Sequence, residues 1–175
     1  PGPSGFEFEA AADAAEMLRP FVDEVMVDHM YSVIGVRRCG KKGAPKLLLD
    51  AHLDEVGYIV TGHKDGYLTF TSLGGVDPRI LPNQELTLLT DPPLPGIVAC
   101  LPPHLQLYLD IGMTQEEAVR RVPIGTPAVY RCECEPMGKG LLCGKAMDDR
   151  VCFAAILGTM ERLAGQELDV DIYVL

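Results

Sequence analysis

The pattern of apolar residues changes twice along the chain, and these changes limit the possible folds more than any other feature. From residue 58 to about residue 142, short β-rich stretches are separated by Gly and Pro turns, which is typical of a small β-barrel or sandwich. Helical and strand patterns alternate on either side of this segment. We therefore predict a β domain at residues 58–142 inserted into an α/β domain that is formed by residues 1–57 and 143–175.

The first α/β segment predicts one helix and three strands. Ser4 and Glu7 have the spacing of a capping box at a helix start. Residues 25–36 alternate as in a hairpin, and residues 46–51 form the nearly continuous apolar run of a strand buried on both faces. The expected apolar face of the helix recurs at helical spacing before Pro20: Phe8, Ala11, Ala12, Ala15 and Leu18.

The inserted segment and the second α/β segment carry equally local signals. His63–Gly66 has the composition of a tight hairpin turn, and Thr114–Glu117 has the spacing of another capping box. A helix is predicted from residue 149 to about residue 164, followed by a strand at residues 169–175. Its expected apolar face comprises Phe153, Ala154, Leu157, Met160, Leu163 and Ala164. The predicted strands of the insert cover residues 58–61, 67–71, 85–89, 96–100 and 128–134.

Charge and cysteine content narrow the classes of partner. The chain has 25 acidic and 15 basic residues and a formal charge of −10, which disfavours binding to nucleic acid. It has no apolar run long enough to span a membrane. The six cysteines are irregularly spaced, which predicts reduced thiols packed as small core residues in a cytoplasmic protein. The strand at residues 169–175 has no turn or polar tail after it, and we expect the chain to be a fragment.

His52 and Asp54 follow the predicted buried strand at residues 46–51. Ligands of open α/β sheets bind beyond the carboxyl ends of strands, so His52 faces the expected site. A neutral imidazole can ligate a metal ion, and a carboxylate two residues later can accept the proton of the other ring nitrogen. Taken alone, the pair is better explained as a solvated strand end.

Asp148 and Asp149 lie at the start of the predicted helix at residues 149–164. Adjacent aspartates at this position commonly cap a helix. A carboxylate can also bridge two metal ions, as two-metal hydrolysis requires. The metal hypothesis gains weight because both segments belong to one α/β core and could converge.

Five motifs resemble, in order, those of the TET-type aminopeptidases of metallopeptidase family forty-two, which include glutamyl aminopeptidases. The motifs span nearly the whole chain and comprise Pro1–Gly5, Ala51–Gly57, Gly74–Arg79, Pro102–His104 and Gly144–Arg150. The resemblance implies a zinc-peptidase-like α/β core interrupted by a PDZ-like β domain. The motif at residues 74–79 lies in the insert and is expected to be structural, and His104 is expected to pack within a loop.

The resemblance also implies a role for individual residues. His52 would ligate one of two divalent metal ions, Asp148 would bridge both, and Asp54 would orient the imidazole of His52. The metal would be zinc, with cobalt and manganese as alternatives. No role is implied for Asp149 or Arg150.

In the family a Glu-Glu pair just beyond the strand at residues 169–175 supplies the general base and a further ligand, and an Asp and a His ligand come later. None of these lies within these 175 residues, because Glu116–Glu117 belongs to the helix start in the insert.

The resulting hypothesis is removal of N-terminal residues from short peptides by a homo-oligomer that assembles through the inserted domain. Three alternatives remain open from sequence. The chain could be a non-catalytic relative that serves as an assembly module, or a metal-dependent hydrolase of a non-peptide substrate. The insert could also bind peptide termini, as free-standing PDZ domains do.

Overall fold

In the computed structural model the chain divides into two compact units. The structure describes residues 1–102 and 106–175, so the packing role expected of His104 lies outside the described residues. The first unit comprises residues 1–54 and 146–175, and the second comprises residues 55–145. The sequence placed these boundaries after residues 57 and 142. The fold is mixed α/β with a closed β-barrel, which confirms the predicted class.

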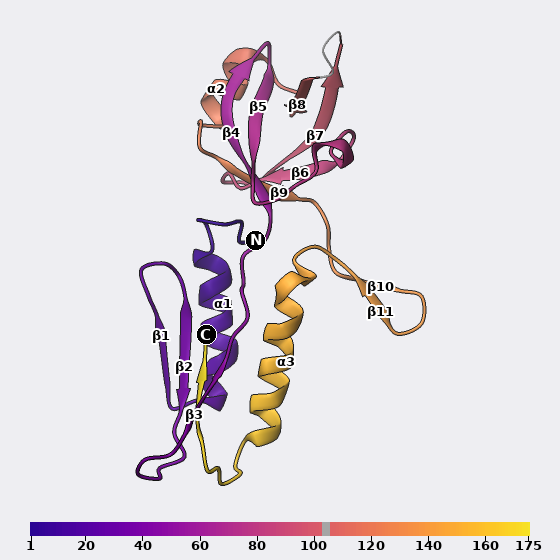
Figure 1. Cartoon of the computed structure of the whole chain (residues 1–175). Helices are drawn as coiled ribbons and strands as arrows, with labels where there is room; N and C mark the ends of the chain where they lie inside the picture. The colour runs from indigo at the N-terminus through magenta and orange to yellow at the C-terminus, as the bar shows by residue number, and fades with distance from the viewer. Residues whose placement is uncertain (103–105) are drawn as a thin grey trace. The chain divides into compact units, whose positions relative to one another are not determined.

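The first unit is built on a four-stranded sheet with the order β1 (Glu24–Val27), β2 (Val33–Arg37), β12 (Asp171–Val174) and β3 (Lys46–Leu49) (Figure 1). β1 and β2 form the predicted hairpin. β12 is antiparallel to β2 but parallel to β3. A parallel pair needs a crossover connection, and here that connection contains the entire second unit and one helix.

Two helices pack on this sheet. α1 (Phe8–Leu18) is followed by the short 3₁₀ turn η1 (Arg19–Phe21), and α3 (Met147–Leu163) precedes β12 (Figure 1). Both helices join one core with the inward-facing residues of β12, Ile172 and Val174. The buried members of this core are Ala11, Ala14, Ala15, Leu18, Val33, Ala51, Ile156, Met160, Ile172 and Val174.

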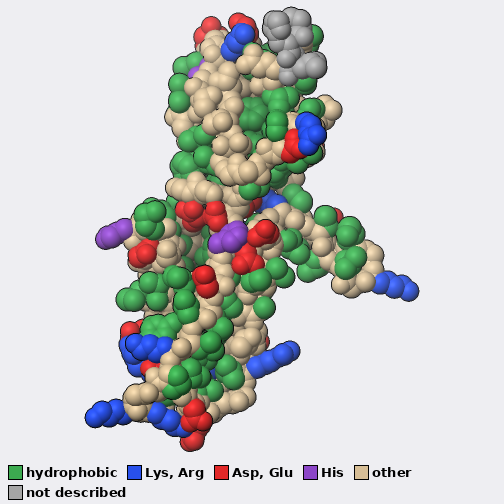
Figure 2. Space-filling view, viewed as in Figure 1, with side chains coloured by type: hydrophobic (Ala, Val, Ile, Leu, Met, Phe, Trp, Pro, Cys, Tyr) green, Lys and Arg blue, Asp and Glu red, His purple; other side chains and the backbone are tan. Residues whose placement is uncertain are grey.

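The strand β3 was predicted to be buried on both faces, and this prediction is wrong. β3 is an edge strand, and the side chain of Leu48 is 57% exposed. Leu48 lies opposite Tyr173, on the other side of the sheet from Ile172 and Val174. Of the residues of β3, only Leu49 packs against the core, and hydrophobic side chains reach the surface of this unit (Figure 2).

The start of α1 also differs from the prediction. Glu7 occupies the N-cap position, and no side chain among the described residues caps this helix. Glu7 instead accepts a hydrogen bond from the backbone N–H of Gly5. Ser4 donates to a carboxylate in another part of the unit, so its spacing from Glu7 does not form a capping box.

The predicted helical faces are rotated slightly from those observed. In α1, Phe8 and Ala12 are exposed and Ala14 is buried. In α3, Ile156 is buried while Ala154 is exposed. The buried face of each helix is the one that packs against Ile172 and Val174 of the sheet. Alanines occur on adjacent faces of the helices, so the sequence does not show which of these faces is buried.

The second unit is a closed six-stranded barrel, in which every strand pairs with two neighbours (Figure 1). The strand β8 was not predicted, nor was the separate hairpin of β10 (Glu135–Met137) and β11 (Leu141–Cys143). Around the barrel, the strands follow the order β4 (Gly57–Lys64), β5 (Tyr67–Leu73), β8 (Gln106–Asp110), β7 (Leu94–Leu101), β6 (Glu85–Leu88) and β9 (Pro127–Tyr130).

Local signals in the barrel sequence are confirmed. Asp65 and Gly66 have positive φ angles in the tight turn between β4 and β5. Thr114 caps α2 (Gln115–Arg121), and Glu117 completes the capping box. The 3₁₀ turn η2 (Pro78–Ile80) is capped by the side chain of Asp77, within the motif expected to be structural.

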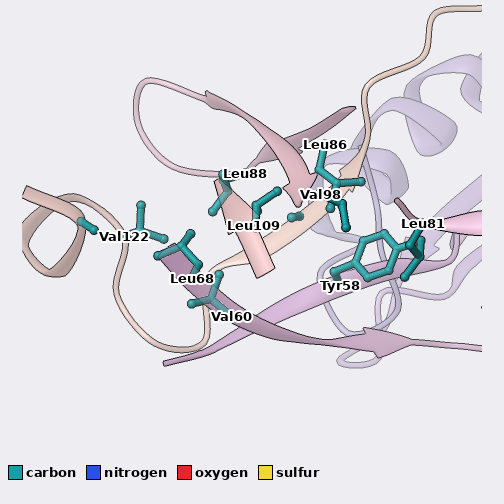
Figure 3. Close-up of a cluster of buried hydrophobic side chains, with 11 residues drawn as sticks. Tyr58, Val60, Leu68, Leu81, Leu86, Leu88, Val98, Leu109 and Val122 are labelled. Atoms are coloured by element: carbon teal, nitrogen blue, oxygen red, sulfur yellow. The ribbon is translucent and has the colours of Figure 1, made fainter. Parts of the chain in front are cut away.

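Large apolar side chains fill the barrel. Nine of them converge in Figure 3, from Tyr58 on β4 to Val122 at the end of α2. The hydroxyl of Tyr58 lies 2.6 Å from that of Tyr130, so the polar end of this buried ring has a partner. The fully enclosed members include Val60, Leu68, Leu86, Leu88, Val98 and Leu109.

The cysteines are free thiols, as expected, but they are not core residues. Five of the six are exposed, and Cys39 is half-buried. His63, near the end of β4, is half-buried, and its Nε2 lies 2.7 Å from the carbonyl oxygen of Val122. Within the described residues, no helix has the length and apolarity needed to cross a membrane.

Candidate metal centre

His52 lies just beyond the carboxyl end of β3. Residues 50–54 belong to no helix or strand. Backbone hydrogen bonds nevertheless tie the start of this segment to the end of β12. The N–H of Ala51 donates to the carbonyl of Leu175 at 3.0 Å, and the N–H of Leu175 donates to the carbonyl of Leu49 at 2.9 Å. These bonds fix the point at which His52 leaves the sheet.

Asp54 contacts the imidazole of His52 from one side. Its Oδ1 lies 2.9 Å from Nδ1 of His52. An ionised carboxylate only accepts hydrogen bonds, so Nδ1 carries the proton and the lone pair of a neutral ring is on Nε2. The hydroxyl of Ser4 donates to Oδ2, the other oxygen of Asp54.

Asp148 contacts the same ring from the opposite side. Its Oδ1 lies 3.0 Å from Nε2 of His52, although the two residues are 96 positions apart in sequence. Asp148 does not continue the helix: its φ and ψ are −90° and 106°, and its peptide bond to Asp149 is cis. Ala146 precedes it in the left-handed conformation, and no side chain among the described residues caps α3. The local backbone therefore directs this carboxylate to His52 and not to the helix N–H groups.

The two carboxylates control the charge of the ring. Partial burial lowers the pKa of His52, but the hydrogen bonds to Asp148 and Asp54 and their negative charges outweigh it, so the pKa stands above its usual value. With acceptors at both nitrogens, the ring needs either a second proton or a metal ion between Nε2 and Asp148.

The spacing of Nε2 and Oδ1 suits a shared metal ion. Metal–nitrogen and metal–oxygen bonds of about 2.0–2.2 Å place two ligands at right angles roughly 3 Å apart, and two ligands of a tetrahedral zinc ion roughly 3.3–3.6 Å apart. The observed separation is 3.0 Å, and the side chain of Asp148 is 96% exposed, so its second oxygen is accessible. Residues 1–102 and 106–175 contain no group of three or more His, Cys, Asp or Glu side chains arranged to hold a metal. A metal centre at this pair would therefore need further ligands.

A pocket of about 290 Å³ adjoins His52 and Asp54 within the first unit. It is lined by apolar residues such as Met30, Tyr31 and Phe153. A substrate side chain could enter here, next to the candidate ligands.

Sequence reasoning placed His52, Asp54 and Asp148 together, and the structure brings them together; their roles at a metal stay predictions. It missed two contacts. Ser4 was assigned to a helix cap but bonds to Asp54, and Arg150, which was given no role, donates from Nε to the carbonyl of Leu53 at 2.8 Å. In the sequence, the only signal for Ser4 was its place in the motif Pro1–Gly5, and the only signal for Arg150 was its place in the motif Gly144–Arg150.

The chain combines an α/β sheet, a His–carboxylate pair at a strand end, and a small barrel joined to it in sequence. These features define the class of the protein: an α/β protein with a candidate metal centre. The chain belongs to the M42 glutamyl aminopeptidase family, whose profile matches residues 32–175.

Individual relatives agree with this family. A lysyl aminopeptidase from Pyrococcus furiosus is 29% identical over 98% of the chain and 54% of that protein. An aminopeptidase structure from the archaeon Desulfurococcus kamchatkensis has a TM-score of 0.90 at 30% identity, over 99% of this chain and 51% of the other. The TET1 peptidase of Pyrococcus horikoshii, described as assembling into a tetrahedron or a large octahedral shell, has a TM-score of 0.84 at 26% identity over 99% and 56%. The chain thus spans about half the length of these relatives.

Proposed function

We propose that the protein is a metal-dependent aminopeptidase that uses two divalent ions, with zinc as the first choice and cobalt or manganese as alternatives. The observation that carries the proposal is the approach of Asp148 Oδ1 to His52 Nε2 at 3.0 Å, while Asp54 occupies the other ring nitrogen, Nδ1. Family membership supports the reaction class, because the family is described as glutamyl aminopeptidases.

In this proposal each side chain has a separate task. His52 binds one ion through Nε2, and Asp54 holds the proton on Nδ1 so that Nε2 keeps its lone pair. Asp148, whose side chain is exposed, would help to hold both ions. When bound, the two ions supply an activated water and polarise the carbonyl of the peptide bond to be cleaved.

We propose further that these 175 residues hold only part of the centre. The described residues provide two adjoining ligands, whereas a catalytic zinc usually has three protein ligands. The general base and the remaining ligands would come from additional polypeptide, in keeping with relatives that are about twice as long.

The proposed substrates are short peptides with a free amino terminus. A formal charge of −10 favours the approach of a protonated amine. The pocket beside His52 would lie next to the residue that is removed. The free thiols of the six cysteines suit a reducing compartment, and we propose a cytoplasmic location.

Assembly is proposed to involve residues 55–145, the barrel unit. The TET1 peptidase of Pyrococcus horikoshii assembles into large shells, and its structure covers nearly all of this chain.

The test is a peptidase assay on the protein with all polypeptide encoded by its natural gene. Release of N-terminal residues should stop after treatment with a chelator and return when Zn²⁺, Co²⁺ or Mn²⁺ is added. Activity that persists after complete metal removal would contradict the proposal. A metal-binding protein without activity towards any peptide would favour the non-catalytic alternative.

A further inference from the structure

We propose that Ser4 and Arg150 are positioning residues that hold the segment of His52 and Asp54 in register with Asp148. The inference rests on the proposed metal function and adds two residues that touch no ligand atom of the metal directly. Ser4 lies in a motif to which the proposed mechanism gives no role, and Arg150 ends the motif that contains Asp148.

Arg150 links the two halves of the candidate centre. It follows Asp148 by two residues, and its Nε donates to the carbonyl of Leu53 at 2.8 Å. Leu53 lies between His52 and Asp54, in the irregular stretch of residues 50–54. One side chain thus ties the backbone beside Asp148 to the backbone between the other two site residues. The guanidinium is planar and always charged, so it fixes direction as well as distance.

The amino-terminal segment packs against this link. Gly2 is buried, and a Cβ at this position would lie 3.2 Å from Nη2 of Arg150 and 3.0 Å from the Cβ of Ala10. Any larger residue would push against the guanidinium or against α1. The absence of a side chain at Gly2 therefore leaves room for the orientation in which Arg150 reaches Leu53.

Ser4 acts two residues further along the same segment. Its hydroxyl donates to Oδ2 of Asp54, while Oδ1 of Asp54 faces Nδ1 of His52. Holding one oxygen fixes the rotation of the carboxylate, which in turn fixes the plane of the imidazole. Ser4, Asp54, His52 and Asp148 form a continuous chain of hydrogen bonds.

A matched control separates positioning from ordinary support of the fold. Arg37 belongs to the same unit and also donates to backbone carbonyls, those of Leu163 and Gln166 at the far end of α3. Arg37→Gln removes the same kind of bond as Arg150→Gln, away from His52. Thr159→Ala is the control for Ser4→Ala, because the Thr159 hydroxyl bonds to the carbonyl of Ala155 within α3.

The experiment is calorimetric titration of Zn²⁺ into the metal-free protein and its variants. Loss of a hydrogen bond behind a metal ligand commonly weakens metal affinity about 10–100-fold. We expect this range for Arg150→Gln and for Ser4→Ala, and no change in Zn²⁺ affinity for Arg37→Gln or Thr159→Ala. Arg150→Lys should recover part of the affinity because its ammonium can still donate one bond.

A second readout does not depend on the metal. Crystal structures of metal-free wild type and Arg150→Gln should show the His52 Nε2 to Asp148 Oδ1 separation increased in the variant only. Unchanged Zn²⁺ affinity together with an unchanged separation would overturn the inference. Equal losses of affinity in Arg150→Gln and Arg37→Gln would also overturn it, since they would indicate general destabilisation. If wild type binds no Zn²⁺, the proposed function fails, and the two crystal structures alone decide the positioning role.

Discussion

The two units of this chain differ in how completely they bury their own surfaces. In the barrel, six strands close on themselves and large side chains fill the interior. The α/β unit has an open sheet, a core rich in alanine, and an edge strand with Leu48 exposed. All three candidate site residues belong to the α/β unit. The comparison indicates that the barrel closes its own core, whereas the unit with the candidate site ends in an open sheet edge; exposed large hydrophobic side chains occur in both units.

The largest expected effect concerns the barrel core. Leu109→Ala removes a fully buried side chain and should cost about 2–5 kcal/mol of unfolding free energy. Leu48→Ala, on the exposed face of β3, should cost less than about 0.5 kcal/mol. Hydrogen exchange read by mass spectrometry would report the two units separately. If Leu109→Ala loosens the α/β unit as much as the barrel, the units do not fold independently.

A smaller effect is expected from overpacking the α/β core. A Cβ added at Gly35 on β2 would lie 2.4 Å from Cδ2 of Leu18 on α1. Gly35→Ala should therefore destabilise this unit by about 1–3 kcal/mol and leave the barrel unchanged.

Gly158→Ala is the matched control for Gly35→Ala, because nothing lies within 4 Å of the added Cβ in the middle of α3. It should stabilise the unit by about 0.5–1 kcal/mol by favouring the helix. Denaturant titration of both variants measures the difference. A loss of stability in Gly158→Ala as large as that in Gly35→Ala would show that the core of this unit is not tightly packed.

The smallest effect is a pH dependence of the sheet in the α/β unit. A hydrogen bond from the backbone N–H of Cys39 holds the pKa of Asp171 below its usual value. A lowered folded pKa stabilises the fold above the unfolded pKa, and this contribution is lost as the pH falls below about 4. Asp171→Asn should flatten the acid dependence of stability in this unit. The measurement is the shift of the denaturation midpoint between pH 6 and each lower pH. If this shift is the same in wild type and variant at every acidic pH, the assignment is contradicted.

Local chemistry made most of the barrel predictable. Asp65–Gly66 requires positive φ, and the Thr114–Glu117 capping box satisfies N–H groups within four residues. The strand β8 was missed because it is only five residues long and its sequence shows no clear alternation of apolar and polar residues. The hairpin β10–β11 was missed because all its residues are exposed and show no buried face.

Tertiary contacts made the α/β unit less predictable. The spacing of Ser4 and Glu7 is that of a capping box, yet the Ser4 hydroxyl donates to the carboxylate of Asp54, 50 residues away. Adjacent aspartates at a helix start favour capping, yet non-helical angles at Asp148 direct it to His52. For the candidate site, the residue types were readable from the motifs, whereas the links through Ser4 and Arg150 depend on side-chain directions that no spacing encodes.

The central claim is that His52 and Asp148 bind the same metal ion. It is tested most directly by calorimetric titration of Zn²⁺ into wild type, His52→Ala, Asp148→Ala and the double variant. The account predicts that either single substitution weakens binding by at least about 100-fold and that the double variant is hardly worse than either one, because the residues act on one ion. Unchanged affinity in both single variants, or two fully additive losses, would contradict it.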